Sequence, residues 1–284
     1  MQWDKAKNFM LAFFVIANIL LAALTYYETG SHTLSRERMD AIQTVFVHNN
    51  IEMYYQIPRS FAPLRPIRVA GHDYNIENLI SIFFPAYADV HKSGDANREV
   101  FTYENLSMVI SNGYIVFDSG VSHIGTPNKE AAISLTQDFI NKHYSDFRLD
   151  LQSTRIVNRG LRLFYRQEYQ GHLIHTNFVE FLVTGEDDDL FIEQVDIQYG
   201  RPMGFAYQPR ELIGPDEALL TFVQNIRLIN NEHIFITYMD LAYFQTTSGL
   251  RETYMPIYAE PFYRIFIEGL DEPFRIHAYT NRMQ

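Results

Sequence analysis

The hydrophobic pattern of the chain opens with one long apolar run. No charged residue occurs between Asn8 and Tyr27, and Phe, Leu and Ile dominate this stretch. A helix over residues 8–27 rises about 30 Å, the thickness of the hydrocarbon core of a bilayer. The run ends in bulky residues and lacks the small residues of a signal-peptide cleavage site, although a cleaved signal or a buried core helix is the alternative. We therefore expect an uncleaved transmembrane helix over residues 8–27.

The residues that flank this run predict its orientation. Lys5 and Lys7 precede it, and the positive-inside rule then places residues 1–7 in the cytoplasm and the main body outside the cell membrane. Trp3, Tyr26 and Tyr27 have the amphipathic rings that favour the membrane interface. Together with the two lysines they are the predicted interface anchors.

A polar residue in the middle of the run suggests a lateral contact. Asn18 is an amide within an apolar helix, and such an amide can join two helices by a hydrogen bond. With Phe14 and Leu21 it forms the predicted transmembrane contact. The alternative is a tolerated polar residue that bonds nothing.

After the run, shorter periodic segments predict an outer body. Residues 28–35 are small and polar and indicate a linker. Ser35 then suits the N-cap of a helix whose apolar residues recur at helical spacing up to residue 46. Residues 106–111 and 114–118 flank Asn112-Gly113, which predicts a tight β-hairpin. We predict that residues 36–120 form an N-terminal α+β subdomain and that residues 91–97 form a polar loop.

An internal repeat fills the rest of the chain. Residues 130–139 match residues 217–226 position by position, and a proline precedes each segment near the expected first helical turn. Aromatic strands follow both segments. The predicted fold class is α+β, with antiparallel sheets each covered by a helix and a duplicated unit over residues 121–205 and 206–284.

The amino-acid composition argues against several classes of function. The 284 residues carry 23 Lys and Arg against 34 Asp and Glu, a formal charge of −11 that argues against a nucleic-acid partner. The chain has no cysteine, which excludes disulfides, thiolate metal sites and a cysteine nucleophile.

Candidate chemistry is sparse. The acidic run 186–189 lacks the spacing of a calcium loop and suits a solvated hairpin tip. His172 and His175 point to opposite faces on a strand, and a zinc site needs further ligands. The chain contains no phosphate loop, nucleophile elbow or zinc-protease motif. We expect no catalytic residue, no metal and no cofactor.

The N-terminal segment nevertheless resembles a known family. Residues 1–7, with their tryptophan and lysine pair, lead into an apolar run containing Asn18 and resemble the YycH/YycI regulatory family of Gram-positive bacteria, closest to the YycI type. Residues 36–58, a helix followed by a strand ending in Ile57-Pro58, resemble the same family. Gln2 and Ala6 differ from its usual pattern.

The resemblance implies a non-enzymatic regulator of a two-component system. Its expected partners are a WalK/YycG-like sensor histidine kinase that controls cell-wall metabolism, a YycH-like protein and the lipid bilayer. Contacts through transmembrane helices and outer domains would shift the kinase between two conformations. The alternatives are a surface-anchored module that binds a peptide or cell-wall fragment, and a membrane-anchored hydrolase.

Overall fold

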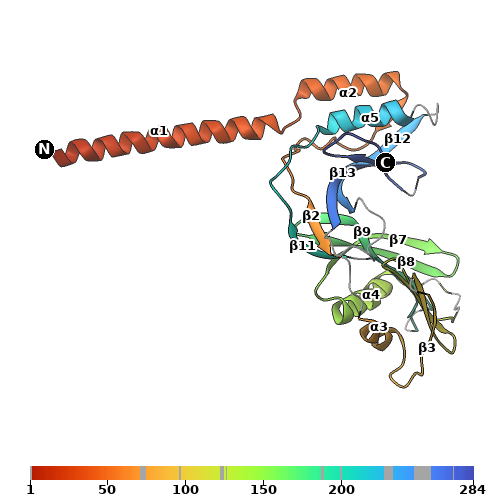
Figure 1. The fold of residues 1–284 in the computed structure, drawn as a ribbon. Coiled ribbons are helices and arrows are strands. Elements are labelled where there is room, and N and C mark those ends of the chain that lie inside the picture. Colours follow the sequence, from red (N-terminus) through yellow and green to blue (C-terminus); the bar gives the residue numbers. More distant parts are fainter. Residues whose placement is uncertain are drawn as a thin grey trace. The chain divides into compact units, whose positions relative to one another are not determined.

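The computed structural model describes most of the chain and is rich in strands (Figure 1). The described residues are 2–70, 75–95, 97–121, 125, 127–186, 189–198, 200–226, 233–245, 257–270 and 272–284. Over these residues the chain forms five helices and fourteen strands.

The chain divides into two compact units that are each assembled from separated segments. The first unit contains Met1–Leu64, Gln208–Asp240 and Phe262–Gln284. The second unit contains Arg65–Tyr207 and Leu241–Pro261. Each unit therefore depends on segments that lie far apart in the sequence.

Three helices belong to the first unit: α1 (Gln2–Ser31), α2 (Arg36–His48) and α5 (Pro215–Ile226). Ser35 caps α2 as predicted, because its hydroxyl accepts a hydrogen bond from the Arg38 backbone N–H at 3.3 Å. The Arg38 guanidinium then reaches the start of α5, where its Nε donates to Asp216 at 2.6 Å and its Nη2 donates to the same carboxylate at 2.8 Å. This pair holds α2 beside α5 (Figure 1).

The strands of the first unit complete a core beneath these helices. β1 (Ile51–Met53) pairs in parallel with the start of β12 (Ile234–Gln245), and the end of β13 (Ile257–Ile267) pairs antiparallel with β14 (Phe274–His277). Apolar side chains of the two packed helices and of these strands are buried, among them Ile42, Phe46, Leu219, Phe222, Ile236, Ile265 and Ile276. One face of this part of the sheet thus supplies the core of the unit.

The second unit holds the longer strands. Ten of its strands lie wholly within it: β2 (Ile67–Ala70), β3 (His91–Gly94), β4 (Arg98–Tyr103), β5 (Leu106–Ser111), β6 (Tyr114–Asp118), β7 (Arg148–Val157), β8 (Gly160–Tyr169), β9 (His172–Thr184), β10 (Phe191–Gln198) and β11 (Arg201–Phe205). The order β9-β10-β6-β5-β4-β3 is antiparallel throughout, and β7 and β8 extend the sheet on the other side of β9. Between β5 and β6, Asn112 and Gly113 both have positive φ, 50° and 77°, as a type I′ turn requires, so the predicted hairpin is confirmed.

Two helices cover part of this sheet. α3 (Ile76–Phe83) and α4 (Lys129–His143) contribute Leu79, Phe83, Ala132 and Ile140 to one buried cluster with the apolar residues of the strands. Within that cluster the Thr136 hydroxyl lies 2.7 Å from the Tyr165 hydroxyl, which satisfies both polar groups in an apolar core.

The predicted fold class is wrong in its architecture. We expected separate antiparallel sheets, each covered by a helix, whereas hydrogen bonding links the fourteen strands into one mixed sheet. The parallel pairings of β12 with β1 and β9 have no local sequence signature, because the paired residues lie 69 positions apart in Tyr243–Ile174 and 183 apart in Ile51–Ile234. The predicted loop over residues 91–97 is also partly wrong, since His91–Gly94 forms the edge strand β3.

The predicted membrane placement is also corrected. None of the helices over the described residues combines the length and the apolarity needed to cross a bilayer. The transmembrane helix over residues 8–27 and the single-pass location with an extracytoplasmic body are therefore not supported.

Candidate functional site

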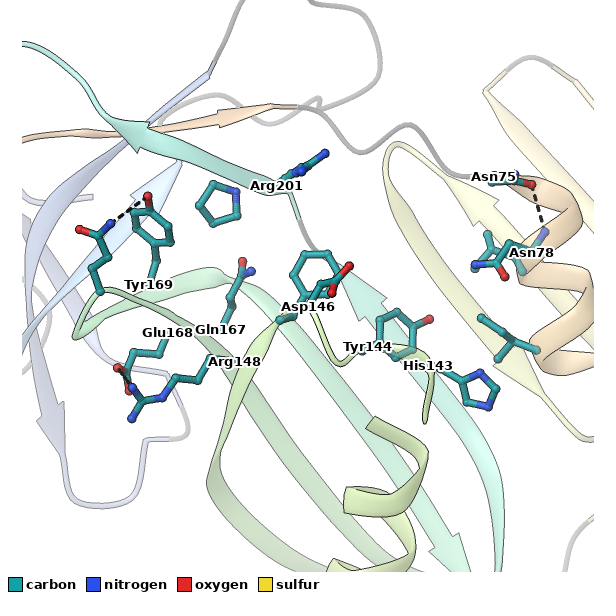
Figure 2. A pocket seen from close by; sticks show the side chains of 15 residues that line it. Asn75, Asn78, His143, Tyr144, Asp146, Arg148, Gln167, Glu168, Tyr169 and Arg201 are labelled. Carbon is teal, nitrogen blue, oxygen red and sulfur yellow. Dashed lines mark hydrogen bonds and ion pairs between the residues drawn. The ribbon is translucent and has the colours of Figure 1, made fainter. Parts of the chain in front are cut away.

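A pocket of about 730 Å³ opens on the surface of the second unit (Figure 2). Its walls come from the start of α3, the end of α4 with the turn after it, the start of β7, the end of β8 and the start of β11. The side chains are mostly polar, and they bring together amides, both signs of charge and aromatic rings. Such convergence of polar groups in a concave surface is typical of a binding site.

A buried amide network supports the floor of the pocket. Gln167 lines the pocket but is only 3% exposed, and its Oε1 accepts a hydrogen bond of 2.6 Å from Asn177 Nδ2. Asn177 is fully buried, donates also to the Gly200 carbonyl at 2.9 Å and accepts from Gln245 Nε2 at 2.9 Å. Because the Gly200 carbonyl is only an acceptor, it fixes the orientation of the Asn177 amide and then that of Gln167. Gln167 can therefore present its N–H donors to a ligand.

A charged cluster forms one side of the pocket. Arg148 Nη1 lies 3.0 Å from Glu168 Oε1, across the register that pairs these residues on β7 and β8. Asp150 lies next to both groups, 4.0 Å from Arg148 Nε. The pKa of Glu168 is raised chiefly by its hydrogen bond with the Asp150 carboxyl and by burial, while Arg148 opposes this rise. Arg148 and Glu168 line the pocket, whereas Asp150 is not among the lining residues and acts on the pocket through Glu168.

A histidine and a separate arginine also line the pocket. Partial burial lowers the pKa of His143, as does neighbouring Lys142, so its imidazole is neutral near pH 7. The ring lies 4.8 Å from that of Phe139, and among the described residues it has no carboxylate to orient it as in a catalytic triad. Arg201, at the start of β11, is exposed and forms no ion pair with any described residue. It is the group best placed to receive a carboxylate from a ligand.

The lining side chains determine which chemical groups the pocket can offer. The lining contains no serine, threonine, cysteine or lysine, and its ionisable groups are carboxyl groups, guanidinium groups, one imidazole and tyrosine hydroxyls. Within the described part of the chain, no three His, Cys, Asp or Glu side chains gather closely enough to hold a metal ion. The pocket instead offers directional donors and acceptors for a polar ligand with charges of both signs.

The residues predicted from sequence lie elsewhere, on α1. Phe14 and Leu21 are exposed, and the Asn18 amide donates to the Phe14 carbonyl one turn earlier at 2.8 Å. Trp3 and Lys7 are also exposed. The side chains of Lys5, Tyr26 and Tyr27 lie outside the described part of the chain. The lateral contact and the interface anchors therefore stay predictions, and none of these residues lines the pocket.

The structure also describes most of the other residues that the sequence offers as candidate metal ligands. His172 on β9 packs near Phe205 and Tyr243, with ring centroids 5.8 and 5.2 Å away, and burial lowers its pKa. His175 stacks on Phe244 at 4.1 Å. Of the acidic run 186–189, residues 187 and 188 lie outside the described residues.

Sequence reasoning missed the pocket, although one signal was present. Leu161, Leu163 and Tyr165 alternate along the buried face of β8, and Gln167 is the next residue in that series. A polar side chain at a core position must form a hydrogen bond, and such a position is therefore a candidate site residue. The other lining residues come from turns and strand ends, which carry no periodic signal.

Comparisons with known proteins support the fold and leave the function open. No protein-family model matches the chain, and no curated protein matches it. A crystal structure of an uncharacterized protein from Eubacterium rectale has a similar fold, with a TM-score of 0.51 and 10% identity over 82% of this chain and 90% of that one. The C-terminal domain of YpeB from Bacillus megaterium is a more distant structural match, with a TM-score of 0.41 and 14% identity over 76% of this chain and 98% of the other. The resemblance to the YycH/YycI family stays a prediction.

Proposed function

We propose that the protein is a non-enzymatic regulator that binds a segment of a partner protein in the pocket of the second unit. The observation that carries this proposal is the combination, in one pocket lining, of Arg201, free of ion pairs among the described residues, with the fixed donor of Gln167 and the carboxyl group of Glu168. These groups suit the carbonyl, carboxylate and ammonium groups of a peptide chain.

For the partner, we propose a sensor histidine kinase of the WalK/YycG type, together with a YycH-like protein. This choice rests on the sequence resemblance of residues 1–7 and 36–58 to the YycI type of the YycH/YycI family. In this proposal the regulator binds two conformations of the kinase unequally and so changes its control of cell-wall metabolism. Contact is by protein surfaces of the folded units.

A direct binding measurement tests the proposal. The purified protein is titrated with the purified sensor domain of the kinase by calorimetry. The titration is then repeated with the Arg201→Glu variant in place of the unchanged protein. We expect Arg201→Glu to weaken binding about 10-fold, since it replaces an attraction with a repulsion. Arg59→Glu, which reverses another exposed arginine outside the pocket, is the matched control and should bind normally. Equal affinity of both variants would count against the pocket as the binding site.

A second candidate function is the binding of a free peptide or a cell-wall fragment. It is favoured by the same pocket, whose charges of both signs suit a short peptide with a free carboxylate and a free ammonium group. Titration with short peptides separates the two candidates. Saturable binding of a peptide that is abolished by Arg201→Glu, with no binding of the kinase domain, would establish the second candidate instead of the first.

A further inference from the structure

A second pocket, of about 530 Å³, opens on the face of the second unit's sheet that α3 and α4 do not cover. Arg162 lines this pocket and lies on β8 between Leu161 and Leu163, which belong to the cluster beneath those helices. Because side chains alternate along a strand, the Arg162 side chain is on the opposite face. The pocket shares no lining residue with the pocket shown in Figure 2. It is therefore a separate site.

The strand register places five of the lining residues in one row across five strands. Arg155 on β7 pairs with Arg162 on β8. Arg162 pairs in turn with Leu182 on β9, which pairs with Gln194 on β10. Gln194 then pairs with Asp118 on β6. Since paired residues share a face, the row is positive at one end, apolar and amide in the middle, and negative at the other end.

The positive end of the row calls for an anion. Like charges directly opposite each other on neighbouring strands destabilise a sheet, and Arg155 lies directly opposite Arg162. Arg162 Nη1 lies 3.1 Å from Glu180 Oε1, but a guanidinium has five N–H donors, so this pair engages only part of the group. A carboxylate bound between the two arginines would offset their repulsion and accept from both.

Beside the negative end lies a buried carboxylate with an unpartnered oxygen. Glu193 lines the pocket and is the extra residue of a β-bulge, where the pairing of β10 with β9 shifts between Ile192 and Gln194. It is only 6% exposed, and its Oε2 has no hydrogen-bond partner among the described residues. Its Oε1 lies 3.8 Å from Arg159 Nη1, which is beyond hydrogen-bond distance. A buried carboxylate oxygen without a donor is costly, so this position calls for a cationic donor such as an ammonium group.

The middle of the row suits a peptide backbone and an apolar side chain. Gln194 Nε2 donates to Asp196 at 2.8 Å, and a carboxylate only accepts, so the Gln194 carbonyl oxygen is left to accept from a ligand N–H. Leu182 is only 6% exposed at its place in the row, whereas Ile156, also in the lining, is 70% exposed. These two side chains offer apolar contact between the charged ends.

We propose that this pocket binds a short peptide of about three residues that has a free ammonium and a free carboxylate terminus. Its carboxylate contacts Arg155 and Arg162, and its ammonium contacts Glu193 and Asp118. A ligand with a single charge would satisfy one end of the row and be repelled by the other, whereas this peptide satisfies both. The inference concerns a site separate from the pocket of the proposed function and does not rest on that function.

The length of the row selects the length of the peptide. Arg162 and Asp118 are three strand spacings apart, about 14 Å, and an extended tripeptide spans about 10 Å. The side chains at the two ends complete the distance. A free amino acid carries both charges on one carbon atom and is too short to reach both ends.

Calorimetric titration of the full chain with the tripeptide Ala-Leu-Ala tests the site. The first reference is the same peptide with an acetylated N-terminus, which lacks the ammonium group. The second has an amidated C-terminus, which lacks the carboxylate, and the third is free leucine. We expect saturable binding of the unblocked tripeptide, and binding at least about 10-fold weaker for each of the three references.

Protein variants assign each end of the peptide. Arg155→Gln should weaken the unblocked tripeptide about 10-fold and leave the amidated one nearly unchanged, because the amidated peptide already lacks the group that Arg155 contacts. Glu193→Gln keeps the shape of the side chain and should weaken the unblocked tripeptide about 10-fold, while the acetylated one is nearly unchanged. Arg98→Gln replaces an exposed arginine on β4 that lines neither pocket, and this matched control should bind normally.

Several outcomes would overturn the proposal. They are the absence of saturable binding, equal binding of the unblocked and blocked peptides, and normal binding by both Arg155→Gln and Glu193→Gln. Binding that is abolished by Arg201→Glu but unaffected by those two variants would place the peptide in the pocket of Figure 2, and would overturn it too. Arg155 is exposed, so Arg155→Gln still tests the site if Glu193→Gln fails to fold.

Discussion

At the scale of single residues, Asn177 connects the stability of the second unit with the shape of its pocket. Its amide bonds to the Gln167 side chain, the Gly200 carbonyl and the Gln245 side chain, all within one buried network. We expect Asn177→Ala to lower the free energy of unfolding by about 2–4 kcal/mol, since it leaves several buried polar groups without partners. Urea denaturation measures this loss. Asn141→Ala, at an exposed position of α4, should change stability by no more than about 0.5 kcal/mol.

Glu168 provides a prediction about protonation. The hydrogen bond with Asp150 raises the pKa of Glu168 and the charge of Arg148 lowers it, so Asp150→Asn should lower that pKa and Arg148→Met should raise it. Carboxyl-carbon NMR titration of the three proteins checks both directions. Because the pKa is higher in the folded state, any stability from this group is present at low pH and is lost as pH rises through the folded-state pKa. Shifts of the same sign in both variants would contradict the arrangement.

At the scale of elements, capping shows how far sequence reasoning reaches. Ser35 and Asn75 cap α2 and α3 by accepting from the backbone N–H three positions further on, and both helix starts follow from the sequence. For α4 the expected proline at the first turn is displaced, because Pro127 precedes the cap Asn128, whereas Pro215 is the first residue of α5. Helix ends could thus be read from short patterns, to within a residue or two.

The cap of α4 gives a measurable consequence. Asn128 Oδ1 accepts from the N–H groups of Glu130 and Ala131 at 2.9 and 3.2 Å. Asn128→Ala should cost about 1 kcal/mol of unfolding free energy, while Asn128→Ser should retain most of the stability. Thermal unfolding followed by circular dichroism distinguishes them. An equal loss in both variants would mean that the side-chain oxygen does not stabilise the helix.

Strand pairing and the site were less accessible to sequence reasoning. The hairpin at Asn112-Gly113 was predictable because its signal is local. β3 was not, because His91–Gly94 is polar and exposed on all four residues. The pocket brings together Asn75, His143, Glu168 and Arg201, whose proximity depends on tertiary structure and leaves no pattern in the sequence. Only the buried polar position of Gln167 pointed toward it.

At the scale of the whole molecule, the two units have interleaved segments. The second unit needs Leu241–Pro261, since β2 pairs with β13 through Ile67↔Ala259 and Ile257↔Val69. We expect a fragment of residues 65–207 to be markedly less protected in amide hydrogen exchange than the same residues in the full chain, and adding back residues 241–261 through a linker to restore protection. Full protection of the shorter fragment would contradict this dependence.

The interleaving also governs the order in which the nascent polypeptide can fold. The first unit contains both Met1–Leu64 and Phe262–Gln284, so a ribosome must synthesise almost the whole protein before that core can close. Domains that are continuous in sequence fold as they emerge, in order from the N-terminus. Here Ile42 and Phe46 of α2 are synthesised early, whereas Ile265 and Ile276 of the same core are synthesised last. Burial of the early residues is delayed until the late ones are present. During that interval these side chains are exposed, and the unfinished protein is a natural client for chaperones that shield apolar segments during translation.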